Sequence, residues 1–205
     1  MNTKVKICGI RSVASANAVS QFGGDFIGFN FVPTSKRYIL PKDAKNIIKK
    51  TGSYIKYVGV FRDQRVEDVD EISQLLNLDF VQLHGNESRE YCNRIKREVI
   101  KVFSLSSKFN IKEVQNNISV YNTKYSLVDR KVQGEGDMLD LEQVSQLCKK
   151  NIIILAGGLN IENISMVIER VHPFAVDVAG GVESEGREDV DKIRQFILSV
   201  KNNVK

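Results

Sequence analysis

The chain reads IIILAGGLN over residues 152–160 and FAVDVAGGV over residues 174–182. In both places a short apolar run, typical of a buried β-strand, ends in a pair of glycines. Glycines let backbone N–H groups approach an anion closely, and a helix that begins after the turn adds a partial positive charge. Two such turns in succession are typical of the loops after strands 7 and 8 of a (β/α)₈ barrel, where a substrate phosphate commonly binds. The stretch therefore predicts a barrel, provided that the chain holds eight β/α units.

Strand-like and helix-like segments alternate eight times along the chain. Apolar runs predict strands at residues 5–8, 26–31, 55–61, 80–83, 99–105, 125–128, 152–155 and 174–178. Apolar spacing and helix-start signals predict helices at residues 12–22, 41–50, 66–76, 87–96, 111–118, 141–149, 161–171 and 190–200. Strands that alternate with helices imply a parallel sheet with helical crossovers, and eight units in one short chain favour closure over an open sheet. The sequence therefore predicts an α/β fold, a single-domain (β/α)₈ TIM barrel over residues 1–205, with its phosphate site after strands 7 and 8.

Length, composition and charge narrow the class of protein. The chain has 205 residues, which is short for such a barrel and leaves little room for insertions. Its net charge of +5 is spread along helices and the C-terminal tail, and it has no tryptophan, so no nucleic-acid partner is expected. No apolar run is long enough to cross a bilayer and no signal peptide precedes the first strand, so we expect no membrane partner and a cytoplasmic location. Three cysteines at scattered spacing give neither a disulfide framework nor a metal motif.

Polar residues at the ends of the predicted strands are the candidate catalytic groups, because the loops after the strands form the active site of such barrels. These residues are Cys8, His84, Asp129 and Asp177. Lys6 lies two residues before Cys8, on the same face of the strand, so its ammonium could favour the thiolate. A thiolate and a carboxylic acid across a barrel mouth are suited to act as base and acid in a proton transfer.

Each candidate also has a structural interpretation. A cysteine on an apolar strand is commonly a small core residue, and an aspartate after a strand commonly caps a helix or forms a turn. His84 precedes a glycine and could belong to an ordinary turn. A structural role is expected for His172, which precedes Pro173 on the face of the barrel opposite the site. Cys92 and Cys148 fall within predicted helices, where packing is their expected role.

Short motifs follow one another from the first predicted strand to the last. They read VKICGI at 5–10, GFNF at 28–31, SKRYI at 35–39, VGVF at 58–61, VQLHG at 81–85, AGGLN at 156–160 and PFAVDV at 173–178. In this order the set resembles the phosphoribosylanthranilate isomerases, the barrel enzymes of tryptophan biosynthesis. Each motif alone is a weak signal, whereas the ordered set covers nearly the whole chain and is specific.

The resemblance implies an Amadori rearrangement without a cofactor or metal. In it, N-(5-phosphoribosyl)anthranilate becomes 1-(2-carboxyphenylamino)-1-deoxyribulose 5-phosphate. Carried onto this sequence, Asp129 would be the general acid that protonates the ribose ring oxygen. Cys8 would be the general base that removes the proton from C2 of the sugar. Arg37 would pair with the anthranilate carboxylate, a role that suits its planar fork.

The same resemblance implies the remaining contacts of the small-molecule substrate. His84 and Asp177 would line the sugar or the ring. The phosphate would lie against the backbone of four glycines, Gly157, Gly158, Gly180 and Gly181. The protein is expected to be a monomer or a homodimer.

Two loops depart from the family pattern. After the sixth predicted strand the chain reads QGEG at 133–136, in a loop shorter than usual, and Glu135 adds a negative charge there. After the last predicted strand, Ala179 and Gly180 stand where hydroxyl residues are common. These departures predict an adjusted substrate affinity rather than a loss of the chemistry.

Two other functions remain open at this point. A similar barrel of histidine biosynthesis performs a related isomerisation, but it should carry an acidic residue in place of Cys8 and a phosphate signature in each half of the chain. A non-catalytic phosphosugar-binding barrel would keep the glycine turns, yet it would have no reason to hold Cys8 and Asp129 together at strand ends. A turnover assay distinguishes the three.

Overall fold

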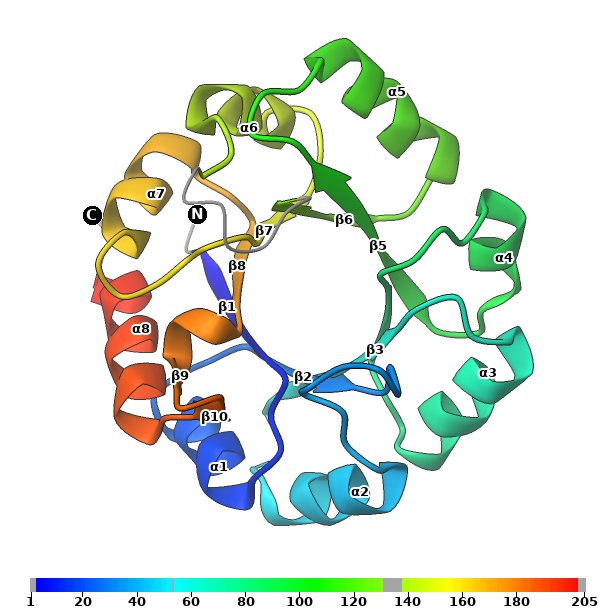
Figure 1. Cartoon of the computed structure of the whole chain (residues 1–205), viewed down its shortest axis with the longest axis vertical. Coiled ribbons are helices and arrows are strands. Elements are labelled where there is room, and N and C mark those ends of the chain that lie inside the picture. Colours follow the sequence, from blue (N-terminus) through cyan, green and yellow to red (C-terminus); the bar gives the residue numbers. More distant parts are fainter. Residues whose placement is uncertain (1–2, 53, 131–137, 203–205) are drawn as a thin grey trace.

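The computed structural model of the chain describes residues 3–52, 54–130 and 138–202. Eight parallel strands hydrogen-bond in sequence order, and the eighth pairs with the first to close a barrel (Figure 1). The predicted (β/α)₈ barrel is thus confirmed. Glu135 and the QGEG stretch lie outside the described residues, so their effect on affinity stays a prediction.

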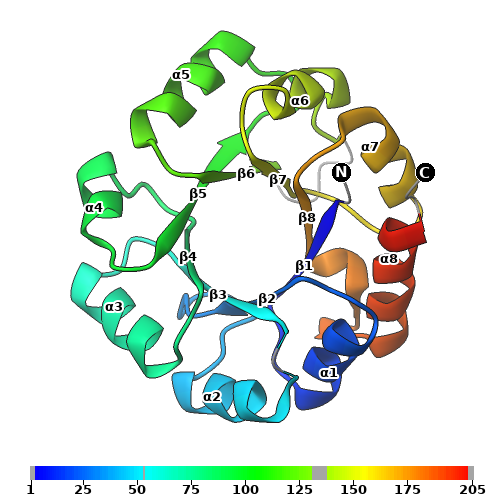
Figure 2. The ribbon, with the colours of Figure 1, turned by 180° about the vertical axis from the view of Figure 1, so that it is seen from behind.

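An inner ring of strands and an outer ring of helices are visible from both ends of the barrel (Figures 1 and 2). The strands are β1 (Lys4–Cys8), β2 (Phe26–Asn30), β3 (Lys56–Phe61), β4 (Phe80–Leu83), β5 (Glu98–Leu105), β6 (Tyr125–Arg130), β7 (Ile153–Leu155) and β8 (Ala175–Val178). The helices are α1 (Val13–Gln21), α2 (Pro41–Lys50), α3 (Val66–Leu75), α4 (Arg89–Arg94), α5 (Ile111–Tyr121), α6 (Leu141–Cys148), α7 (Ile164–Val171) and α8 (Val190–Asn202). Between β8 and α8 the chain forms a short 3₁₀ helix, η1 (Gly180–Val182), and a hairpin of β9 (Glu183–Ser184) and β10 (Arg187–Glu188).

Two predicted helix ends are wrong by three residues. Helix α5 continues to Tyr121, because the left-handed residue that ends it is Asn122, with φ of 52°. Helix α7 begins three residues late because the Asn160 side chain accepts hydrogen bonds from the N–H groups of residues 162 and 163, which holds a turn before the helix. The β9–β10 hairpin is absent from the prediction, since strands of two residues carry no periodic signal.

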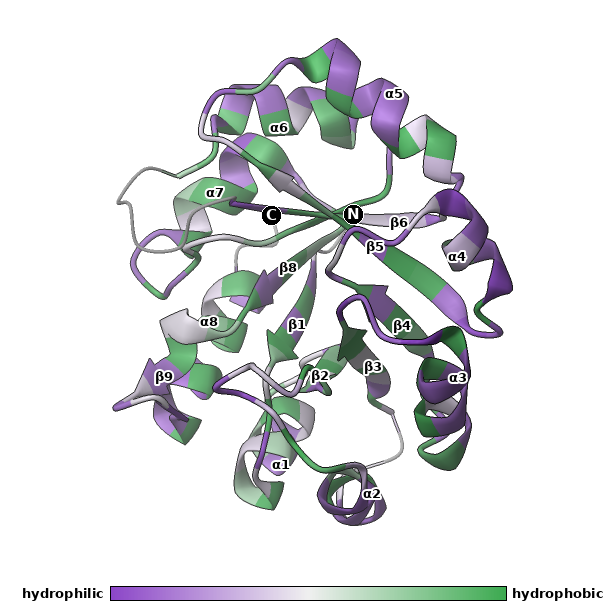
Figure 3. Ribbon diagram, turned by 45° about the vertical axis from the view of Figure 1, so that its right-hand side comes forward, coloured by the Kyte–Doolittle hydropathy of each residue, from purple (hydrophilic) through white to green (hydrophobic). Residues whose placement is uncertain are grey.

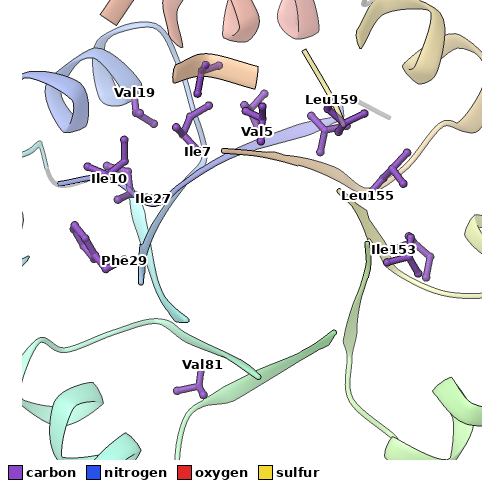
Figure 4. Packing of buried hydrophobic residues seen from close by; sticks show 14 of the residues in the cluster. Val5, Ile7, Ile10, Val19, Ile27, Phe29, Val81, Ile153, Leu155 and Leu159 are labelled. Atoms are coloured by element: carbon purple, nitrogen blue, oxygen red, sulfur yellow. The ribbon is translucent and has the colours of Figure 1, made fainter. Parts of the chain in front are cut away.

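The alternation of side chains along each strand separates two apolar layers. Outward-pointing residues such as Val5, Ile7, Ile27 and Phe29 lie outside the ring of strands and pack under the helices (Figure 4). The helices accordingly carry apolar and polar stretches side by side (Figure 3). The inward-pointing layer fills the barrel with Phe26, Val58, Ile100, Val102, Leu127, Ile154, Ala156 and Ala175. Burying such a side chain contributes about 1.5–3 kcal/mol, so this double layer holds the strand ends in fixed positions.

The structure shows the state of the cysteines and the character of the helices. All three cysteines are free, and Cys92 and Cys148 pack within α4 and α6 as predicted. Within the described parts of the chain, none of the helices has the length and apolar character needed to span a membrane.

Candidate active site

A cavity of about 670 Å³ opens at the carboxyl ends of the strands. Its volume falls within the range of about 300–1,000 Å³ that is common for small-molecule sites. The cavity brings together all the predicted site residues, namely Cys8, Arg37, His84, Asp129, Gly157, Gly158, Asp177, Gly180 and Gly181. They come from six of the eight β/α units, so the barrel closure is what makes them neighbours.

Cys8 ends β1 and lines the cavity beside two charged groups. The Lys6 side chain is fully buried, and its Nζ lies 2.9 Å from Oδ1 of Asp177. Gly28 stands opposite Cys8 on β2. A Cβ atom at Gly28 would lie 2.9 Å from Sγ of Cys8 and 3.1 Å from Nζ of Lys6. The missing side chain therefore leaves the space in which the thiol and the ammonium meet.

The pKa of Cys8 depends on burial as well as on the nearby Lys6. Burial raises the pKa of the thiol, and this effect outweighs the nearby Lys6 ammonium, which acts to lower it. The expected influence of Lys6 on the thiolate is therefore confirmed in direction, although the effect of burial outweighs it. Burial acts to lower the pKa of Lys6, but the carboxylate of Asp177 and the thiol of Cys8 raise it overall, so Lys6 stays protonated.

Asp129 lies within β6, not after it, and its side chain is nearly buried on the cavity wall. Burial, together with the negative charge of Asp177, raises its pKa to about 6. The backbone N–H of Arg130 donates to its Oδ1 at 2.8 Å, a local contact of the kind that turn-forming aspartates make. Nε2 of His84 lies 3.7 Å from its Oδ2, too far for a hydrogen bond. Burial lowers the pKa of His84, so at neutral pH its imidazole is uncharged.

Arg37 lies in the loop after β2, which folds back because the Ile39 N–H donates to the Asn30 carbonyl at 3.0 Å. The stem of Arg37 crosses Gly9, whose positive φ of 84° and missing side chain make this approach possible. Its guanidinium forms two bonds with Glu183, from Nε to Oε1 at 2.5 Å and from Nη2 to Oε2 at 2.8 Å. The sequence does not predict this ion pair, because Glu183 belongs to the hairpin after β8.

The two glycine turns form one continuous part of the cavity wall. Gly157 and Gly158 have φ of 93° and 77°, values that side chains rarely allow. Gly181 packs against the carbonyl oxygen of Leu159, where a Cβ atom has no room. Beside this contact, a Cβ atom at Gly158 would lie 3.1 Å from the guanidinium carbon of Arg130.

Charged groups on the cavity wall favour an anionic ligand. Four cationic side chains, Lys36, Arg37, Arg62 and Arg130, line it together with the carboxyl groups of Asp129 and Asp177. Positive potential focused in a cleft attracts substrates of the opposite charge. Among the described residues, no three His, Cys, Asp or Glu side chains form a group that could hold a metal ion.

Two features, one in the site and one beside it, are missing from the sequence-based prediction. Gln82 is buried on the cavity wall, and its Oε1 has no hydrogen-bond partner within the described residues. Its place in the VQLHG motif, two residues before His84 and thus on the same strand face, is a signal that could have identified it. Outside the cavity, the buried Glu87–Lys101 pair, with Nζ and Oε2 2.8 Å apart, anchors the loop after β4 through Gly85.

The sequence of this chain is similar to a known family over nearly its whole length. The family model described as N-(5'-phosphoribosyl)anthranilate (PRA) isomerase matches residues 5–199. The chain belongs to this family. A phosphoribosylanthranilate isomerase from Bacillus cereus (strain AH187) is 39% identical over 204 residues, which cover 97% of this chain and 98% of the relative. Another from Geobacter sp. (strain M21) is 37% identical over 202 residues, with the same coverage.

Solved structures of phosphoribosylanthranilate isomerases have the same fold. The enzyme from Thermotoga maritima superposes with a TM-score of 0.89 at 35% identity, covering 98% of this chain and 99% of the other. A phosphoribosylanthranilate isomerase in complex with reduced 1-(o-carboxyphenylamino)-1-deoxyribulose 5-phosphate superposes with a TM-score of 0.86 at 34% identity and the same coverage. The family and fold that the sequence motifs indicate are therefore confirmed.

Proposed function

We propose that this chain catalyses the Amadori rearrangement of N-(5-phosphoribosyl)anthranilate, with Asp129 as general acid and Cys8 as general base. As a member of its family it is an isomerase of tryptophan biosynthesis, of the intramolecular oxidoreductase type. One observation carries the assignment of the two residues. A single cavity holds a thiol beside a buried ammonium and a carboxyl group with a pKa of about 6. That pair can donate one proton and accept another.

The proposed reaction is a pair of proton transfers. Protonated Asp129 donates its proton to the ribose ring oxygen, the C1–O bond breaks, and the nitrogen lone pair forms a Schiff base with C1. The thiolate of Cys8 removes the proton from C2, and the C2–H electrons move towards the Schiff base to give an enolamine. The enolamine tautomerises to the ketone, so the product contains the same atoms and electrons as the substrate. Lys6 stabilises the negative charge on sulfur before the transfer.

Arg37 can bind the substrate carboxylate while Glu183 stays in place. Glu183 uses the Nε–H and one N–H of Nη2, and a guanidinium carries five N–H donors. The remaining edge, formed by Nη1 and Nη2, is a second fork of the kind that carboxylates bind in pairs. We assign to Glu183 the role of orienting that edge.

The glycine turns after β7 and β8 are the proposed phosphate site. Their contact at Gly181 joins two backbone segments into one concave wall, and Arg130 adds a guanidinium beside Gly158. A phosphate held there and a carboxylate held at Arg37 would fix both ends of the substrate and place its reacting carbons between them.

The proposed assembly and location rest on a relative and on the composition of the chain. A phosphoribosylanthranilate isomerase from Thermotoga maritima is described as dimeric. We propose that this chain is a homodimer or a monomer in the cytoplasm, and size-exclusion chromatography with light scattering distinguishes the two states.

The test of the reaction is a turnover assay on phosphoribosylanthranilate generated in place, followed by the loss of anthranilate fluorescence. Turnover that needs neither metal nor added cofactor is the expected result. The histidine-biosynthesis substrate is assayed in parallel. Turnover of that substrate alone would make this a histidine-pathway isomerase, and binding of phosphosugars without turnover of either would make it a binding protein.

The pH dependence follows from the two pKa values of the free enzyme. The active form carries a proton on Asp129 and none on Cys8. The pKa of Asp129 is about 6, whereas burial raises the pKa of Cys8 above its ordinary value. At a pH between these two pKa values, Asp129 and Cys8 together hold one proton, which lies most often on the sulfur of Cys8. We expect kcat/KM to rise through about pH 6, to stay level, and to fall where Cys8 also ionises. A profile without the limb near pH 6 would contradict the assignment of Asp129.

Replacing Arg37 by alanine is expected to raise KM by about 10- to 100-fold with little change in kcat, because hydrogen bonds to charged groups contribute about 1.5–3 kcal/mol. Steady-state kinetics measure both constants. The Arg37→Ala/Glu183→Gln double variant removes the charge that the single change leaves unpaired and should retain the raised KM. Arg94→Ala, which removes an exposed ion pair with Glu67, is the control. An unchanged KM in the double variant would rule out the carboxylate clamp.

A further inference from the structure

Arg11 lies in the loop between β1 and α1 and contacts both segments that surround Arg37. Its Nε lies 2.9 Å from Oε1 of Glu188 and its Nη2 lies 2.8 Å from the carbonyl oxygen of Gly186. Its Nη1 lies 2.9 Å from the carbonyl oxygen of Lys36, the residue just before Arg37. One guanidinium thus joins the β9–β10 hairpin to the loop after β2.

The hairpin that Arg11 holds has a well-defined geometry. Residues 185 and 186, at its turn, have φ of 51° and 74°, the pair of left-handed values found in type I′ turns. Its register sets Glu183 opposite Glu188, so the two side chains leave the same face of the hairpin. Glu188 binds Arg11, and Glu183 binds Arg37. The two ion pairs therefore lie side by side, because their glutamates form one cross-strand pair of the hairpin.

In both ion pairs the glutamate side chain is shielded from solvent. The side chains of Glu183 and Glu188 are 8% and 7% exposed, so water and salt screen these two ion pairs less than they screen pairs between exposed side chains. Arg11 itself is not among the residues that line the cavity. Its influence on a ligand in the cavity must therefore pass through the groups it holds.

We propose that Arg11 is a positioning residue that fixes the orientation of Arg37 for the substrate carboxylate. It acts from two directions: it holds the backbone at Lys36, and it holds the hairpin that presents Glu183 to the Arg37 guanidinium. A preset guanidinium spares the ordering cost that a flexible side chain meets on binding. This inference rests on the proposed role of Arg37 as the carboxylate clamp.

The experiment is a double-mutant cycle of Arg11→Met and Arg37→Ala in the full chain, with KM and kcat measured on phosphoribosylanthranilate. Arg11→Met keeps the apolar stem but removes all three hydrogen bonds. We expect it to raise KM about tenfold and to change kcat less than threefold. In the Arg37→Ala background it should raise KM less than twofold further, because the group it positions is gone. Arg11→Lys keeps the charge and one donor position, so we expect an intermediate KM.

Arg94→Met is the matched control, since it removes an exposed arginine–glutamate pair between α4 and α3 and should leave both constants unchanged. Thermal melts confirm that each variant is folded. If Arg37→Ala raises KM and Arg11→Met does not, the positioning role is wrong while the clamp stands. If Arg11→Met raises KM equally in both backgrounds, it acts independently of Arg37, and the proposal is overturned. If Arg37→Ala itself leaves KM unchanged, the clamp and the positioning role are both wrong.

Discussion

Replacing Asp129 by asparagine is expected to lower kcat by about 10²- to 10⁴-fold, the range typical for loss of a positioned general acid. The amide keeps the shape of the side chain but has no acidic proton to give to the ring oxygen. Substrate affinity should change less, because the proposed phosphate and carboxylate contacts remain. Steady-state kinetics of the variant beside the wild type measure both effects. Near-normal turnover would show that another group is the acid.

The same substitution should make the protein more stable above pH 6. The folded pKa of Asp129 is raised from an ordinary 3.8 to about 6, so the folded state binds more protons than the unfolded state between these values. Stability from this group therefore falls as pH rises through that window. At 1.36 kcal/mol per pKa unit, the charged carboxylate costs up to about 3 kcal/mol at neutral pH, and asparagine removes that cost.

Urea unfolding at pH 4 and pH 8 measures this difference. The variant should gain stability over the wild type at pH 8 and lose most of that gain at pH 4. Asp43→Asn, on the exposed face of α2, is the matched control and should show neither effect. Equal stability of Asp129→Asn and wild type at both pH values would mean that the carboxyl group carries no desolvation cost.

Replacing Cys8 by alanine is expected to lower kcat by about 10²- to 10⁴-fold, because nothing then removes the proton from C2. Cys8→Ser should be as inactive, since a hydroxyl ionises far less readily than a thiol. The pair of variants separates chemistry from packing, because serine fills nearly the same volume. Turnover measured by anthranilate fluorescence reads out both.

Cys148→Ala is the control for the loss of a thiol, because Cys148 packs in α6, outside the cavity. Its turnover should equal that of the wild type. If Cys8→Ala retained turnover within tenfold of the wild type, the reaction would stand and the base would have to be sought among the other groups on the cavity wall.

The sequence predicts the barrel well because each unit carries its own signal. Val5 and Ile7 alternate with Lys6 and Cys8, and this period of two both marks a strand and assigns its faces. The site is then expected at the carboxyl ends of the strands, because all parallel strands of a closed barrel end at the same mouth. This rule alone brings Cys8, Asp129 and the glycine turns to one cavity before any distance is known.

The fold, the family and the residues that meet at the mouth of the barrel can thus be predicted from the order of amino acids. The electrostatic states of these residues and their partners depend on the folded structure. Spacing in the chain places Lys6 near Cys8, but burial, which depends on every surrounding strand, sets the net pKa of the thiol. Glu183 and Arg37 are 146 residues apart in sequence, and their ion pair forms because β8 closes on β1 and brings the hairpin over the loop after β2. Local patterns encode which face of a strand a residue occupies, whereas contacts across the closure depend on the whole chain being folded.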